Sequence, residues 1–150
     1  MRKRHYTSPN LRRHGDSQEV IQWGFLGIAA AFWTASVLKY GPVMRPETYG
    51  TLIVQWPTQF WAGSLMLASC LFLLGIIING RWKWSPLLRL AGASWHCFTL
   101  LAFSFGGATA EFGENLAISA GVFAAIHFWF AALNLSDLRF ALRGDNAARC

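Results

Sequence analysis

The sequence predicts an all-α integral membrane protein, a bundle of four transmembrane helices with both termini in the cytoplasm. Two observations predict this fold class. Apolar residues make up 54% of the 150 residues and charged residues 13%, about half the charged share of an ordinary soluble domain. The charges also lie at the chain ends and in short clusters. They leave four apolar runs of roughly 20 residues, the length that crosses a hydrocarbon core.

The four predicted spans divide the chain into three regions. A basic cytoplasmic tail covers residues 1–17, a transmembrane domain covers 18–136, and a cytoplasmic C-terminal tail covers 137–150. Within the domain, the spans are expected at about 20–38, 58–79, 86–110 and 115–135.

The first span follows a long basic region, so a signal peptide is the competing interpretation. The run is longer than the apolar part of a typical signal peptide, and Phe32 and Trp33 lie near any suitable cleavage point. We therefore expect an uncleaved helix. The prolines and glycines that follow Lys39 end it. The apolar stretch "TLIVQW", residues 51–56, is too short to span and is expected at the interface or at the start of the next helix.

Tryptophans mark the ends of the second span, as expected at the level of lipid headgroups. Trp56 and Trp61 lie at its outer edge, and "RWKW", residues 81–84, follows its inner edge. The third and fourth spans are joined by "AEFGEN", residues 110–115, which is short enough only for an antiparallel hairpin.

The positive charge indicates the topology. Of 13 Lys and Arg residues, five lie in the N-terminal tail, three around the second connection and three in the C-terminal tail, but only two in the first connection. Because Lys and Arg accumulate in cytoplasmic loops, both termini are expected in the cytoplasm. This distribution favours the lipid bilayer as the partner of the basic residues and argues against nucleic acid.

Small residues recur at a spacing of four on two spans. The first span carries Gly27, Ala31 and Ala35, and the fourth carries a similar stripe centred on Gly121. Small side chains allow helix backbones to approach closely in lipid. Packing within one chain and self-association through an outward-facing stripe both account for this pattern, and the sequence leaves that choice open.

His96 and His127 stand out because each lies in an otherwise apolar span. The midpoint between them falls inside the 110–115 connection, so an antiparallel hairpin places both at the same depth, near the middle of the bilayer. At helical spacing, each shares a face with small or polar residues. These companions are Arg89, Gly92, Thr99, Asn134 and Asp137.

Two expectations follow from this alignment. Arg89 and Asp137 should form a partly exposed contact near the inner boundary, worth about 1 kcal/mol or less. Gly92 should hold the third and fourth spans close together, so that Gly92→Leu would push their backbones apart.

Three interpretations of the histidine pair compete. In the favoured one, neutral imidazoles face each other and fasten the hairpin without a metal ion. In the second, the pair handles protons or lines a cavity, since polar groups inside membranes are often functional. In the third, His96 and His127 ligate a haem. The small flanking residues argue against haem because they let the two backbones approach to about 8 Å.

Catalysis has little support in the sequence. There is no nucleophile–base motif, no phosphate-binding glycine loop and no carboxylate pair within a span, and the three cysteines lack metal-ligand spacing. The predicted function is that of a non-enzymatic, cofactor-free protein that packs with itself or with a membrane partner. It would be holin-like, in a bacterial cytoplasmic membrane. The alternative is a haem-binding or proton-handling redox subunit built on His96 and His127.

Overall fold

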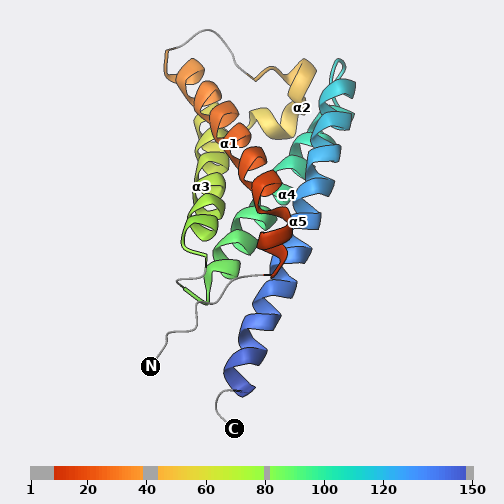
Figure 1. Cartoon of the computed structure of the whole chain (residues 1–150). Coiled ribbons are helices and arrows are strands. Elements are labelled where there is room, and N and C mark those ends of the chain that lie inside the picture. Colours follow the sequence, from red (N-terminus) through yellow and green to blue (C-terminus); the bar gives the residue numbers. More distant parts are fainter. Residues whose placement is uncertain (1–8, 39–43, 80–81, 148–150) are drawn as a thin grey trace.

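The computed structural model describes residues 9–38, 44–79 and 82–147, which form helices and no strand (Figure 1). The predicted all-α class is confirmed. In chain order, the helices are α1 (Pro9–Val37), α2 (Pro46–Val54), α3 (Thr58–Ile77), α4 (Ser85–Ala108) and α5 (Glu114–Ala147).

Three of the described helices are long and apolar enough to cross a membrane, which indicates an integral membrane protein. The stretches are Gly15–Val37 in α1, Thr58–Ile77 in α3 and Glu114–Arg143 in α5. The predicted span 86–110 corresponds to α4, which is not among these three. Arg89, His96 and Thr99 interrupt its apolar sequence.

Two helices extend past the predicted spans. α1 begins at Pro9, inside the stretch assigned to the basic tail, and α5 continues through most of the stretch assigned to the C-terminal tail. The polar ends of the chain therefore prolong the same helices rather than forming separate segments. Residues 1–8 and 148–150 lie outside the described part of the chain.

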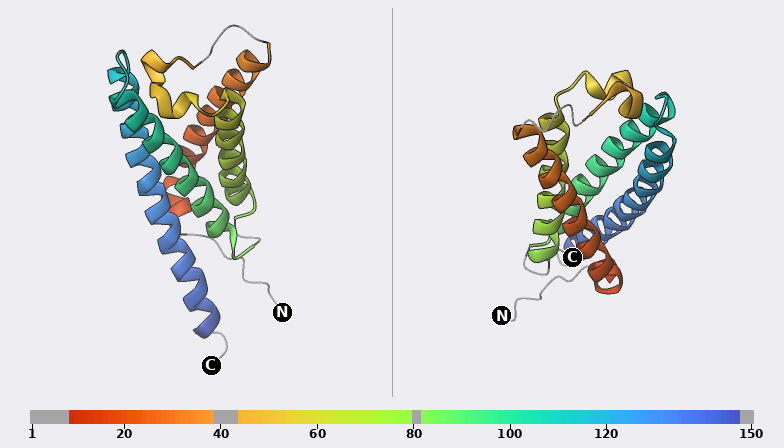
Figure 2. Two further views of the ribbon diagram at one scale, coloured as in Figure 1. Left: turned by 180° about the vertical axis from the view of Figure 1, so that it is seen from behind. Right: turned by 90° about the horizontal axis from the view of Figure 1, so that it is seen from above.

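α4 lies between α3 and α5 and packs closely against both (Figures 1 and 2). α1 packs along α3 and crosses α5, then diverges from α5 toward the end of the bundle where α2 lies. The start of α1 and the end of α5 are both at the opposite end. The predicted antiparallel hairpin of the last two helices is present.

α2 is held against α4 by a close backbone approach. Gly50 interrupts α2 with a φ of 73°, a conformation that favours glycine. A Cβ atom added there would lie 2.5 Å from the carbonyl oxygen of Gly106. The indole nitrogen of Trp61 donates to the carbonyl oxygen of Ile53 at 2.9 Å, which ties the end of α2 to α3.

The interior is layered along the bundle axis. Toward α2 lies an apolar cluster that includes Phe25, Trp61 and Phe103. A second apolar cluster, formed by Phe72, Ala93 and Phe130, lies nearer the other end. On α3, α4 and α5, which contribute to both clusters, a fully buried polar side chain lies between the two clusters, and these side chains belong to the candidate site.

Candidate functional site

Each of the four long helices contributes one fully buried polar side chain to a layer between the two apolar clusters. We call it the polar layer. Its members are Gln22 of α1, Ser69 of α3, His96 of α4 and His127 of α5. The register of each helix places them together. On α3, for example, Ser69 lies one turn from Leu65 of the first cluster and about one turn from Phe72 of the second.

The two histidines face each other, as predicted. Their ring centroids are 4.6 Å apart and the ring planes are inclined by 41°. They are not hydrogen-bonded to each other but to different helices. The Gln22 amide nitrogen donates to Nε2 of His127 at 3.1 Å, and Nε2 of His96 lies 3.2 Å from the Ser69 hydroxyl. The pair therefore joins all four long helices, which is more than the hairpin fastening we expected.

Local hydrogen bonds fix the tautomer of His127. Its Nδ1 donates to the carbonyl oxygen of Phe123 at 2.8 Å. A carbonyl oxygen can only accept, so Nδ1 carries the proton and Nε2 of the neutral ring is an acceptor. This matches the amide donor of Gln22. Nδ1 of His96, in contrast, has no hydrogen-bond partner among the described residues.

This arrangement does not fit a haem ligated by both histidines. Such a haem would lie between the two imidazoles, with each Nε2 or Nδ1 directed at the iron. The rings instead contact each other, and the Nε2 atoms bond to Gln22 and Ser69. Phe25 also packs against both rings, with centroid distances of 5.2 Å to His96 and 4.8 Å to His127.

Buried polar groups continue from the polar layer toward the end of the bundle opposite α2. Gln18 lies one turn before Gln22 on α1, and Asn134 lies two turns after His127 on α5; both are fully buried. The amide oxygen and nitrogen of each lack a partner within the described chain. Buried amides of this kind are the groups that hold ordered water in proteins. We call the polar layer and this continuation the polar column.

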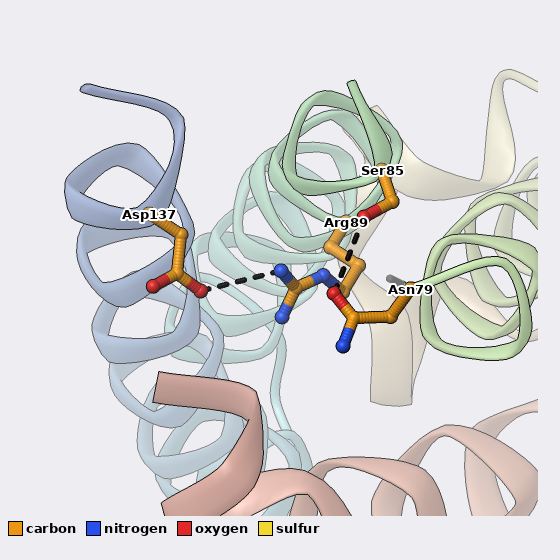
Figure 3. Close-up of polar contacts among 4 residues, drawn as sticks. All are labelled: Asn79, Ser85, Arg89 and Asp137. Carbon is orange, nitrogen blue, oxygen red and sulfur yellow. Dashed lines mark hydrogen bonds and ion pairs between the residues drawn. The ribbon is translucent and has the colours of Figure 1, made fainter. Parts of the chain in front are cut away.

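An ion pair lies at the far end of the polar column. Nη2 of Arg89 is 3.2 Å from Oδ2 of Asp137, and both side chains are fully buried (Figure 3). The predicted contact is present, but the prediction of partial exposure is wrong. α3 covers the arginine from the other side, since a Cβ atom added to Gly75 would lie 2.6 Å from its Cγ. Beside it, the Ser85 hydroxyl donates to Asn79 Oδ1 at 3.4 Å.

Gly92 packs against a different helix from the one expected. A Cβ atom added to it would lie 2.6 Å from the Ala68 carbonyl oxygen and 2.9 Å from the Phe72 Cβ, both on α3. The expectation that Gly92 sets the distance between α4 and α5 is therefore wrong. The expectation rested on the helix face that Gly92 shares with His96. Because α4 lies between α3 and α5, this face contacts α3 as well as α5. Thr99, on the same face, is buried.

The two small-residue stripes have different environments. Gly121 is half-buried, and a Cβ atom there would lie 3.2 Å from the Ser104 hydroxyl of α4. On α1, Gly27 and Ala31 are exposed and Ala35 is half-buried. A Cβ atom added to Gly27 would meet no atom of the described chain within 4 Å. Gly121 thus packs within the hairpin, whereas Gly27 and Ala31 of the α1 stripe face outward.

Three members of the polar column were not singled out from the sequence. Gln18 and Gln22 lie four residues apart and thus on one helix face at the start of the first apolar run, a signal that could have identified them. Ser69 carries no comparable signal, because single serines are common in membrane helices. No family model matches the chain, and neither a curated protein nor a solved structure is significantly similar to it.

Proposed function

We propose that the chain is a non-enzymatic membrane protein that takes up a proton at its histidine pair through the polar column. The observation that carries this proposal is the contact between two buried imidazoles, at one end of a line of buried polar groups that leads to Arg89 and Asp137. Ionisable groups inside membrane proteins commonly mark proton pathways. Since two adjacent imidazolium cations repel each other, the pair accepts one proton.

We propose that a proton reaches the pair from the Asp137 end of the bundle, where the buried amides of Gln18 and Asn134 accompany the apolar cluster of Phe72, Ala93 and Phe130. Phe25 covers both imidazoles on the side toward α2, and the cluster behind it is apolar. A proton that arrives from the Asp137 end is therefore held rather than conducted through the protein. This favours a proton-responsive membrane protein over an open channel.

The proposed topology has four spans, with α4 as the fourth membrane-crossing helix. α4 is packed between two candidate spans, and its exposed side chains include Leu87, Phe98, Leu101 and Phe105, which suit contact with lipid. The charge distribution supports placing the Arg89–Asp137 end in the cytoplasm. The proposed location is a bacterial cytoplasmic membrane.

Nitrogen-15 NMR of the imidazoles in lipid nanodiscs tests proton uptake directly. His5→Gln and His14→Gln remove the other two histidines, so that His96 and His127 give the remaining signals. Titration from about pH 4 to pH 9 should show one proton shared by the two rings, and His96→Gln should change the titration of His127. Two imidazoles that stay neutral over this range in a folded protein would rule out the proposal.

A second candidate function is self-association through α1, the basis of a holin-like assembly. The observation that favours it is the outward-facing stripe at Gly27 and Ala31. Gly27→Leu should then reduce the oligomers captured by chemical cross-linking in membranes, whereas Ala125→Leu, at an exposed position on α5, should not. For a holin-like assembly, expression should also collapse the membrane potential. Cross-linking that is equal in both variants would exclude this surface.

A further inference from the structure

A cavity of about 310 Å³ lies in the half of the bundle nearer α2. Its volume is within the range of pockets that bind small ligands. Its lining comes mainly from apolar and aromatic side chains. It includes Gly24, Phe25 and Phe32 of α1, Trp61 of α3, and Leu116 and Phe123 of α5.

The cavity lies between α1 and α5, where these two helices diverge toward α2 (Figure 1). The residues that α1, α3 and α5 contribute belong to the three candidate membrane spans, so it faces the apolar layer of a bilayer. Its lining offers little to a polar ligand. The Ser119 hydroxyl already donates to the Asn115 carbonyl oxygen at 2.7 Å, and the Trp61 indole N–H donates to the Ile53 carbonyl oxygen at 2.9 Å. Tyr49 is the remaining polar side chain of the wall.

We propose that this cavity binds one acyl chain of a membrane phospholipid. A hydrocarbon chain is the ligand that an apolar wall within a bilayer selects, because it fills the space without leaving a polar group unpaired. Phe25 lines the cavity and packs against His96 and His127, so the acyl chain would pass within one side chain of both histidines.

The mouth of the cavity suits a lipid headgroup. Met44 lines the cavity near α2, and the next residue, Arg45, is exposed. A guanidinium group at this position is complementary to a lipid phosphate. This charge favours a phospholipid over an uncharged side chain of a second copy of the protein. The site is independent of the proposed proton uptake, since it lies on the other side of Phe25.

Two glycines of α1 provide a matched pair of variants. A Cβ atom added to Gly24 or to Gly27 would meet no described atom within 4 Å, so both positions accept a larger side chain. Gly24 lines the cavity and Gly27 does not. Gly24→Phe should therefore fill the cavity, whereas Gly27→Phe should change the outer surface of the same helix by the same amount.

Photo-cross-linking with a phospholipid that carries a diazirine at the end of one acyl chain tests the proposal. The full-length protein is reconstituted with this lipid and irradiated, and the labelled residues are identified by mass spectrometry. Adducts are expected on the cavity residues of α1 and α5, several-fold weaker in Gly24→Phe and unchanged in Gly27→Phe. If Gly24→Phe does not fold, Ser119→Phe replaces it as the variant with a filled cavity, because Ser119 lines the cavity from α5. Equal labelling of the filled and control variants, or protein–protein adducts at these residues in place of lipid, would overturn the proposal.

Discussion

Arg89 and Asp137 are each completely buried, which changes what their contact contributes to stability. A surface ion pair contributes little because water screens both charges. A buried pair has given up the hydration of both ions, so its net contribution can be small, yet removal of one partner leaves an unpaired charge inside the protein. The pair is therefore more important for the integrity of the bundle than a contact of 3.2 Å by itself suggests.

Asp137→Asn should destabilise the protein strongly, by about 3–5 kcal/mol, because it removes the carboxylate charge that faces the buried Arg89 guanidinium. The double variant Arg89→Met with Asp137→Leu should lose clearly less, since it removes both charges. Equilibrium unfolding in sodium dodecyl sulfate, followed by circular dichroism, measures both. If the double variant loses as much as the two single variants combined, the charges do not act as a pair.

The histidines should tolerate a polar replacement better than an apolar one. Hydrogen bonds between membrane helices average about 0.6 kcal/mol, so His127→Gln should lower the unfolding free energy by about 1 kcal/mol or less. His127→Leu should cost more, about 1–3 kcal/mol, because the buried Gln22 amide loses its acceptor. The same unfolding assay measures both. A leucine variant as stable as the glutamine variant would show that the Gln22 bond contributes nothing.

Single residues could be predicted from the sequence where they broke a pattern. His96, His127, Arg89 and Asp137 were identified because ionisable side chains interrupt or flank apolar runs, and the hairpin register then placed them in pairs. The hydrogen-bond partners of the histidines could not be found in this way. Ser69 lies on a helix whose position relative to α4 is set by packing among all the helices, not by the hairpin.

Among the elements, α3 and α4 make a close contact through glycine. Gly92 faces the Ala68 carbonyl oxygen, and Gly75 faces the first turns of α4 at Ser85 and Arg89. Both glycines lie where a side chain would separate the helices. Close packing replaces the hydrophobic effect as the force between helices in lipid. Gly92 and Gly75 therefore set how closely α4 approaches α3. Ser69 and His96 meet at the same interface.

Gly92→Leu should therefore separate α3 from α4 and lower the stability by about 1–3 kcal/mol or more. Gly92→Ala should already be harmful, because its Cβ would lie 2.6 Å from a backbone oxygen. Gly27→Leu is the matched control and should have little effect on unfolding of the monomer. Cysteine cross-linking between α3 and α4 reports the separation. Unchanged cross-linking in a destabilised Gly92→Leu variant would point to another cause.

At the level of elements, the apolar runs located the helices, but the ends of those runs did not locate the ends of the helices. α1 and α5 continue into polar sequence, because helix formation does not require an apolar environment. The prolines and glycines correctly indicated a break after the first span. The short helix α2 in the same connection depends on the tertiary contact of Gly50 with Gly106, which periodicity cannot show.

In the whole molecule, α4 is the long helix without a stretch apolar enough to count as a membrane span, and it is also the most central of the described helices. The sequence explains the first property through Arg89, His96 and Thr99, which are all buried inside the bundle. A helix with polar groups on its inner face can still cross a membrane when its neighbours cover that face. The order in which the helices pack follows from the fit of many side chains, so the sequence alone did not predict it.

Reporter fusions test the four-span topology, because each connection of the bundle is predicted to lie on a defined side. A reporter active only outside the cytoplasm should work after Gly41 or Gly113 and should be silent after Lys83 or Cys150. The physical basis is the excess of Lys and Arg at the end of the bundle where α1 begins and α5 ends. If α4 did not cross the membrane, the Lys83 and Gly113 fusions would report the same side. That result would also remove the one-sided access proposed for the histidine pair, since the polar column would no longer follow the membrane normal.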